Sequence, residues 1–306
     1  MARFGWHVGC FLLCAGSLGV LQAQDRDSIK AAKFRSIRWT TGPATAALGD
    51  EATLRVPAAC GFSGAGGTKT FMEITENPPT GDEVGMLLCR EPHDTAFWFT
   101  IFEYDSSGYV RDDEGQSLDA AAILERLREG NGEGNKARRA RGWDTLTIRG
   151  WQIPPHYDQQ THNLTWSMIV AAQSGAVSVN HSVRLLGRGG VMRVALVADP
   201  DQIATAVPAF NALLREYKFV PGKTYAEWHS GDKVAAYGLT ALIAGGAGAV
   251  ALKTGLLAKL GKLIAAAFVA AWKFLAAAAA AATAWLRSMF KRKGSGTPPT
   301  TPKDTP

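Results

Sequence analysis

The chain lacks the short motifs that mark the commonest enzyme classes. It contains no G-x-S-x-G, P-loop or H-E-x-x-H motif, and no G-x-G-x-x-G in a strand–turn–helix context. Glycine and proline are modest, at 33 and 14 of 306 residues, whereas 46% of the residues are hydrophobic. These values disfavour collagen-like, disordered and disulfide-scaffold proteins, and they predict a folded core.

Cysteine is scarce. Of the 4 cysteines, Cys10 and Cys14 fall in an N-terminal segment that we expect to be removed, which leaves Cys60 and Cys89. In an oxidising compartment these two could form a disulfide, or they could be two buried thiols, and the sequence does not decide between the two. No C-x-x-C pair and no matching histidine pair accompanies them, so we expect no metal and no cofactor.

Acidic side chains almost vanish from the C-terminal part of the chain. From Lys253 onward there are nine Lys or Arg and one acidic residue, within an overall net charge of +6. Residues 24–252 are therefore mildly acidic, and the basic charge lies beside a very apolar stretch. This distribution favours a membrane surface over a nucleic acid as a partner.

The first 23 residues have the features of a secretory signal peptide. Arg3 precedes an apolar run from Val8 to Leu21, and Ala23 ends the segment before polar residues. The run is too short to span a bilayer. We therefore predict cleavage after Ala23 and a mature chain that starts near Gln24.

Strand-like runs and two helical segments alternate between residues 24 and 233. Alternating apolar residues between Gly and Pro breakers predict strands at 52–56, 68–75, 84–89, 96–104, 144–151, 164–173, 176–186 and 191–198. Helical spacing predicts helices at 117–129 and 200–217, capped by Ser117 and Asp199. The order of elements indicates an α+β domain rich in antiparallel sheet, with two main helices.

A known family shares several segments with this chain, namely Gly108–Asp113, Gly150–Asp158, Leu164–Trp166, Val179-Asn180 with Arg184–Val191, and Gly231–Gly238. The chain resembles the family called domain of unknown function 2167 over about Ile37 to Leu252. The resemblance implies a membrane-anchored bacterial envelope protein. It implies no activity and transfers no catalytic residue, and the two cysteines of the mature chain are not part of its pattern.

The candidate binding residues are Trp151, His156, Tyr157, Asp158, Trp166, Asn180, Arg184 and Arg188. His156 could act as a general base with Asp158 as its orienter. We favour the alternative, in which both tryptophans are core or sheet-face aromatics and Pro154-Pro155 rigidifies a turn. A metal site at His156 and His162 is weakly supported, because no third ligand lies nearby in the sequence.

Three charged segments have two interpretations each. Asp112-Asp113-Glu114 could bind a divalent cation, but we favour a solvated turn before a helix. Arg188-Gly189-Gly190 could hold an anion, but a glycine pair between two strands is typical of a hairpin turn. The basic run of Lys136, Arg138, Arg139 and Arg141 is expected in a mobile, solvated loop.

An uncharged run of 19 residues, from Val234 to Leu252, is long enough to span a membrane. A buried core helix is the alternative. The basic residues that follow favour the span, because they fit the positive-inside rule. Ala241, Gly245 and Ala249 form a small-residue stripe through which such helices could oligomerise.

Residues 253–293 also have two interpretations. Their basic and apolar side chains lie on opposite sides of a helix, which favours an amphipathic helix on the anionic lipid of the inner leaflet. The alternative is a second span at 263–286, which would bury Lys273 in the membrane. Residues 294–306 are rich in Gly, Ser, Thr and Pro and are expected to be a disordered tail.

Together these features predict a protein of the bacterial inner membrane that crosses once, or twice if 263–286 spans, with its main domain at 24–233 in the periplasm. We expect that domain to bind an unidentified envelope protein or ligand. One alternative is an envelope hydrolase that acts on a cell-wall or lipid-derived substrate with residues around His156. Another is a structural protein that oligomerises through its membrane helix.

Overall fold

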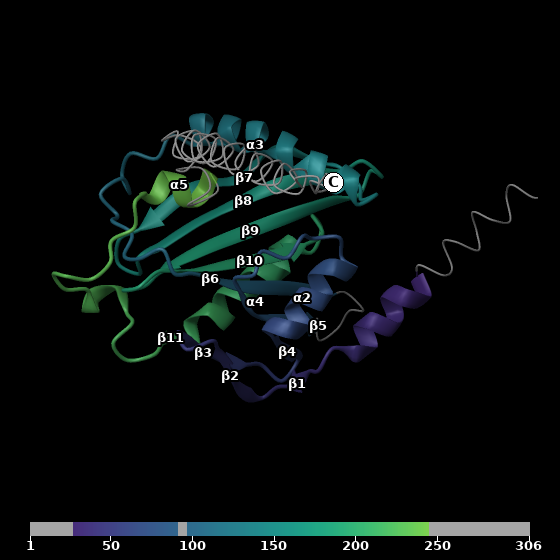
Figure 1. The fold of residues 1–306 in the computed structure, drawn as a ribbon, viewed down its shortest axis with the longest axis horizontal. Helices are drawn as coiled ribbons and strands as arrows, with labels where there is room; N and C mark the ends of the chain where they lie inside the picture. The colour runs from purple at the N-terminus through teal and green to yellow at the C-terminus, as the bar shows by residue number, and fades with distance from the viewer. Residues whose placement is uncertain (1–26, 91–96, 245–306) are drawn as a thin grey trace, which may run out of the picture. The chain divides into compact units, whose positions relative to one another are not determined.

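The computed structural model describes residues 27–90 and 97–244, and its main feature is an eight-stranded sheet (Figure 1). Neighbouring strands pair antiparallel throughout, which confirms the predicted α+β domain. The strands follow the order β1 (Thr40–Thr41), β4 (Cys60–Gly64), β5 (Glu83–Arg90), β6 (Phe97–Asp105), β10 (Val191–Ala198), β9 (Val177–Leu186), β8 (Asn163–Ala172) and β7 (Leu146–Asp158).

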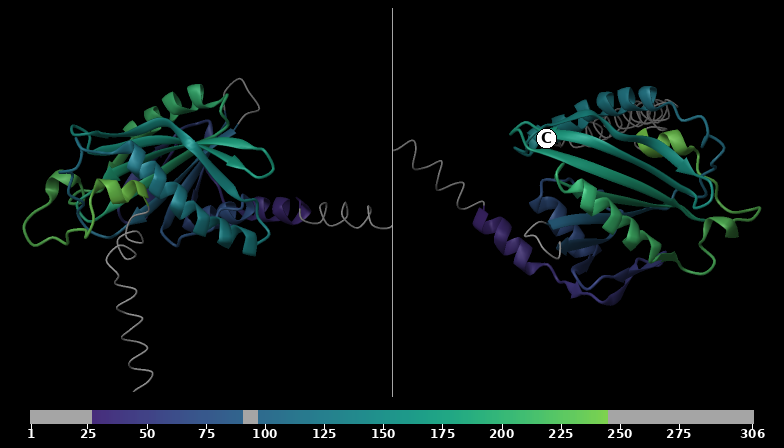
Figure 2. Two further views of the ribbon diagram at one scale, coloured as in Figure 1. Left: turned by 90° about the horizontal axis from the view of Figure 1, so that it is seen from above. Right: turned by 180° about the vertical axis from the view of Figure 1, so that it is seen from behind.

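A second sheet of three strands completes the core, in the order β11 (Tyr217–Phe219), β3 (Ala52–Val56) and β2 (Ala44–Leu48). Helix α4 (Ile203–Arg215) contributes Phe210 to a cluster that also contains Leu54 of the small sheet and Phe102 of the large one. Figure 2 shows α4 on one face of the large sheet, and α2 (Ala65–Ile74) and α3 (Ala120–Ala140) on the other.

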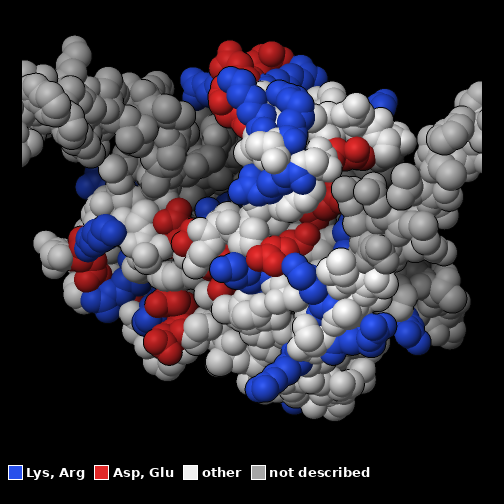
Figure 3. All heavy atoms as spheres, turned by 45° about the vertical axis from the view of Figure 1, so that its right-hand side comes forward, with Lys and Arg blue, Asp and Glu red and all other residues white. Residues whose placement is uncertain are grey.

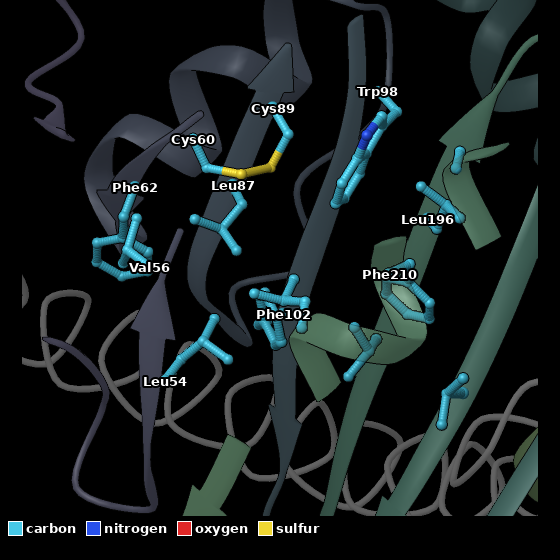
Figure 4. Close-up of a cluster of buried hydrophobic side chains, with 14 of the residues drawn as sticks. Leu54, Val56, Cys60, Phe62, Leu87, Cys89, Trp98, Phe102, Leu196 and Phe210 are labelled. Atoms are coloured by element: carbon cyan, nitrogen blue, oxygen red, sulfur yellow. A yellow bond between two sulfur atoms is a disulfide. The ribbon is translucent and has the colours of Figure 1, made fainter. Parts of the chain in front are cut away.

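Cys60 and Cys89 lie directly opposite each other on β4 and β5, and their Sγ atoms are bonded. Figure 4 shows this disulfide beside Leu87 in the apolar cluster. The two cysteines are separated by 29 residues, and closing a loop of that length stabilises the fold by about 3–4 kcal/mol in the chain-entropy model. Of the two states left open by the sequence, this is the one that the structure contains.

The strand predicted at 68–75 is wrong, because this segment belongs to α2. Its buried residues, Thr68, Phe71 and Met72, have helical spacing. The hydroxyl of Thr68 donates to the carbonyl of Gly64, as helical threonines commonly do. Gly67 lets α2 approach β4 closely, since a Cβ there would lie 2.0 Å from the Oγ of Ser63.

Helix α3 runs past its predicted end at residue 129, and the basic run is not a loop but its last turns. Long-range contacts hold this extension. The side-chain amides of Asn131 and Asn135 donate to the carbonyl of Leu146 on β7, and Arg138 donates to the carbonyl of Glu76. The cap is Asp119, rather than the predicted Ser117.

Strand β7 continues through Pro154-Pro155, where the sequence suggests a turn, and therefore includes His156. The strand tolerates the two prolines because it lies at the edge of the sheet and its register shifts between Ile153 and His156. The strands predicted at 52–56, 84–89, 96–104, 164–173, 176–186 and 191–198 are confirmed, as is the helix at 200–217. The side chain of Asp199 does not cap that helix, which begins after Gln202.

The described part holds more helices than the two predicted, since α2, a helix at 27–36 and the short α5 (Leu239–Ala244) accompany α3 and α4. Within residues 27–90 and 97–244, no helix is both long and apolar enough to cross a membrane. The predicted signal peptide, residues 245–252 of the predicted span, and residues 253–306 lie outside the described residues.

Candidate functional site

Most of the segments that resemble the family reach one end of the eight-stranded sheet, whereas Val179-Asn180 lies towards the other end, opposite Ala198 and Val197. Val191 pairs with both Asp105 and Leu186, and Asn163 pairs with both Asp158 and Leu185. The last residues of β6, β7 and β9 and the first residues of β8 and β10 therefore lie at the same end of the sheet. We call the loops that connect them, together with residues 220–238, the loop end. Its side chains are mostly engaged with one another, as the following contacts show.

The segment that starts the predicted span is held at the loop end. Val234 forms a β-bridge with Tyr109, and the backbone N–H of Ala235 donates to the carbonyl of Tyr109. The Oη of Tyr237 donates to Asp105 Oδ2 at 2.6 Å. Burial and this carboxylate both raise the pKa of Tyr237, so the tyrosine remains a hydrogen-bond donor at neutral pH.

A carboxylate–tyrosine–histidine cluster lies beside this bridge. The Oη of Tyr157 donates to Asp112 Oδ2 at 2.6 Å and lies 3.0 Å from His162 Nδ1. The ring of His162 packs on that of Tyr225, with centroids 4.4 Å apart. Burial raises the pKa of Asp112, but hydrogen bonds from Tyr157 and Tyr225 outweigh it, so the net pKa is lowered. Burial and the Asp112 hydrogen bond raise the pKa of Tyr157, which suits a structural clamp better than proton transfer.

Arg188 and Asp232 form a two-pronged ion pair at the loop end. Arg188 Nε lies 2.7 Å from Asp232 Oδ2, and Arg188 Nη2 lies 2.8 Å from Asp232 Oδ1. The hydrogen bonds from Arg188 hold the pKa of the Asp232 carboxyl well below its usual range. The pair joins the hairpin after β9 to the segment that begins at Gly231, two of the segments that resemble the family.

A depression of about 330 Å³ lies next to this pair, and its basic groups are already satisfied. Lys223 Nζ lies 2.7 Å from Glu51 Oε1, and Lys233 donates to the carbonyl of Ser106. Gly190 serves strand packing, since a Cβ there would lie 2.1 Å from the carbonyl oxygen of Asp105. The geometry therefore assigns Gly190 to packing, and the charged groups beside the hairpin already have partners.

The His156–Asp158 pair is not arranged as a base and its orienter. His156 is exposed on β7, and no side chain of the described residues donates to it or accepts from it. Asp158 accepts from the backbone of Gln160 in the following turn. Trp151 donates through its Nε1 to the carbonyl of Ala120, which ties β7 to α3.

The acidic segment before α3 is also divided among different partners. Asp112 bonds to Tyr157, whereas Glu114 accepts from the backbone N–H of Thr240 at the start of α5. In residues 27–90 and 97–244, no group of three His, Cys, Asp or Glu side chains is placed to hold a metal.

Three other candidate residues, Trp166, Asn180 and Arg184, share one face of the sheet. Trp166 pairs directly with Ser182, and Asn180 and Arg184 flank Ser182 at the two positions of the same face. The guanidinium carbon of Arg184 lies 4.6 Å from the ring centroid of Trp166. Each of the three residues has a buried polar atom without a hydrogen-bond partner in the described part of the chain: Trp166 Nε1, Asn180 Oδ1 and Arg184 Nε. We call these residues the Arg184 face.

Sequence reasoning missed two neighbours of this face. Arg193 of β10 lies opposite Arg184, and Glu103 of β6 lies opposite Arg193. A charged residue within the apolar run of β10 was the available signal. On the side of the domain drawn in Figure 3, basic and acidic side chains are likewise intermixed.

Comparison with known proteins gives the family. A family model described as a protein of unknown function (DUF2167) matches residues 40–280. The chain belongs to this family. No curated protein matches it. The solution structure of cyanobacterial PsbP (CyanoP) from Synechocystis sp. PCC 6803 is similar over 60% of this chain and 92% of that one, at 10% identity and a TM-score of 0.33. A likeness at this level indicates no shared function.

Proposed function

We propose that this chain is an envelope protein anchored in the inner membrane, whose domain at 24–233 lies in the periplasm and acts by binding a partner or ligand. The observation that carries the binding role is the Arg184 face. It gathers unpartnered polar atoms, whereas the titratable groups of the loop end are engaged with one another. Buried polar atoms without partners cost stability, and a ligand that pairs with them would offset that cost.

Two features support the location. The N-terminal segment has the features of a signal peptide, and the disulfide between Cys60 and Cys89 is of the kind that persists in oxidising compartments. The first part of the uncharged run, Val234 to Ala244, packs on the domain. The anchor is therefore supported by the apolar residues after Ala244 and by the basic residues among them, with the basic segment on anionic lipid of the inner leaflet. Among the described residues, no side-chain hydrogen bond of the exposed His156 supports the hydrolase.

The location is tested by thiol alkylation in cells. Whole cells are treated with a thiol-alkylating reagent, one sample without reduction and one after reduction. A chain that lacks residues 2–23 is the control. We expect Cys60 and Cys89 to resist alkylation in the full chain and to react in the control, which stays in the reducing cytoplasm. Equal reaction in both chains would overturn export.

The anchor is tested by membrane extraction. The full chain should stay with the membrane fraction after high-salt and carbonate washing, because a spanning helix is not released by breaking ionic contacts. Release by carbonate would contradict the anchor. A Ser295→Cys variant then distinguishes one crossing from two: protection from an impermeant thiol reagent in spheroplasts indicates one crossing, and labelling indicates a second span.

A further inference from the structure

Arg184 differs from the neighbouring Arg193 in its ion pairs. Arg193, directly opposite on β10, pairs with Asp82 at 2.7 Å and lies 3.6 Å from Glu103. Glu103 also accepts from the hydroxyl of Thr80 at 2.6 Å. No carboxylate among the described residues forms an ion pair with Arg184, whose one hydrogen bond there is a 3.3 Å contact from Nη1 to the carbonyl of Val183.

The Arg184 guanidinium is held in place without a direct ion pair among the described residues. Its plane is supported by the ring of Trp166, a contact that orients an arginine for recognition of planar or tetrahedral anions. Burial and the facing charge of Arg193 lower the pKa of Arg184 to about 10, although the nearby charges of Glu103 and Asp105 raise it, so the group remains cationic at neutral pH. A half-buried cation without a direct ion pair among the described residues is costly, and a bound anion would reduce that cost.

Donors and an acceptor accompany this cation. Arg184 Nε and Trp166 Nε1 are unpartnered donors, and Asn180 Oδ1 is an unpartnered acceptor. Between Arg184 and Asn180 on this face lie Ser182 and Ala195, which pair with each other and have short side chains. The set matches an anionic oxygen group that accepts from the two donors and carries a hydroxyl that donates to the amide oxygen.

We propose that the Arg184 face is a binding site for a phosphate group, free or carried by a lipid headgroup. Phosphate presents several oxygens to donors on different strands, and arginine binds it through charge-assisted hydrogen bonds. A phosphate with a neighbouring hydroxyl, as in a glycerol phosphate, offers acceptors to the two donors and a donor to the amide oxygen. This inference specifies the ligand class for the binding role proposed above, and it rests on that proposed role.

The experiment is isothermal titration calorimetry of the full chain in a neutral detergent at pH 7, with three probes. Inorganic phosphate and glycerol phosphate test a free source, and dihexanoyl phosphatidylglycerol tests a lipid source. Chloride at equal ionic strength and dihexanoyl phosphatidylcholine are the ligand controls. Binding of the first two probes indicates a free phosphate ligand. Binding of phosphatidylglycerol alone indicates a lipid headgroup.

Three variants assign the binding to this face. Arg184→Gln should weaken binding by about tenfold or more, because it removes the charge-assisted bonds. Trp166→Phe keeps an aromatic ring and removes one donor, so it should weaken binding by about threefold to tenfold. Arg55→Gln, at an exposed arginine of β3, should bind as the wild type does.

Absence of binding by the wild type to all three probes would overturn the site, as would unchanged affinity in Arg184→Gln. If Arg184→Gln does not fold, Trp166→Phe decides, and unchanged affinity there is the contradicting result. Failure of this experiment leaves the alkylation and carbonate results standing. Failure of those tests would remove the periplasmic location and leave any phosphate binding intact.

Discussion

Arg184 on β9 and Arg188 in the hairpin that follows it differ in their partners. Arg188 places two nitrogens on the two carboxylate oxygens of Asp232 and closes the loop end. Arg184 stacks on Trp166 and has no carboxylate partner among the described residues. The family segments therefore contain two kinds of polar residue: one that is paired within the fold, and one that has no carboxylate partner in the described part of the chain and that we propose binds a ligand.

The largest effect on stability is expected from the disulfide, which lies in the apolar core away from both arginines. Replacing both Cys60 and Cys89 by Ala should lower the free energy of unfolding by about 3 kcal/mol, since the unfolded chain regains the entropy of the closed loop. Urea unfolding followed by tryptophan fluorescence measures the loss. Reduction of the wild type should reproduce it, and a loss below about 1 kcal/mol would contradict the estimate.

The next largest loss in the free energy of unfolding is expected at the Tyr157 cluster. Tyr157→Phe removes the hydrogen bond to Asp112 and should cost about 1–2 kcal/mol at pH 7. The folded-state pKa of Asp112 is lowered, so its contribution is full above the usual carboxyl pKa and is lost as the pH falls through the folded value. The gap between wild type and variant should therefore close in acid. A gap that is independent of pH would count against the clamp.

The Arg188–Asp232 pair should give a smaller loss, because both side chains are partly exposed to solvent. Asp232→Asn weakens the two-pronged contact and should lower the thermal unfolding midpoint at pH 7. Asp50→Asn, at an exposed carboxylate of a turn, is the matched control and should leave the midpoint unchanged. Equal midpoints for the two variants would show that the pair does not close the loop end.

His156 should give the smallest effect of the set. It is exposed on an edge strand, so His156→Ala should change the free energy of unfolding by no more than about 0.5 kcal/mol. The same variant tests the hydrolase. If the purified chain hydrolysed an envelope substrate and this change abolished the activity without loss of stability, the ranking of binding above catalysis would be reversed.

Much of the fold was predictable because local patterns determine it. The strands at 84–89 and 191–198 follow from apolar runs between breakers, and their antiparallel pairing follows from the short connections. Long-range contacts explain the misses. The end of α3 depends on a bond from Arg138 to Glu76, 62 residues away, and α2 depends on the close approach that Gly67 permits.

The candidate site was predictable in its residues but not in its arrangement. Trp166, Asn180 and Arg184 lie in the segments that resemble the family, and the register of β8 and β9 is what places them on one face. The same register separates them from His156 and Asp158, which lie at the sheet edge and the loop end. A shift of one residue would turn each side chain to the other face, and the sequence does not specify register to that accuracy.

The most direct test of the contrast between the two arginines is a pair of thermal unfolding measurements at pH 7 without phosphate. Arg184→Met replaces an unpartnered cation by an apolar side chain of similar length, so the midpoint should stay the same or rise. Arg188→Met leaves Asp232 without its partner, so the midpoint should fall. If Arg184→Met lowers the midpoint as much as Arg188→Met does, Arg184 is an architectural residue and the account of a ligand face is wrong.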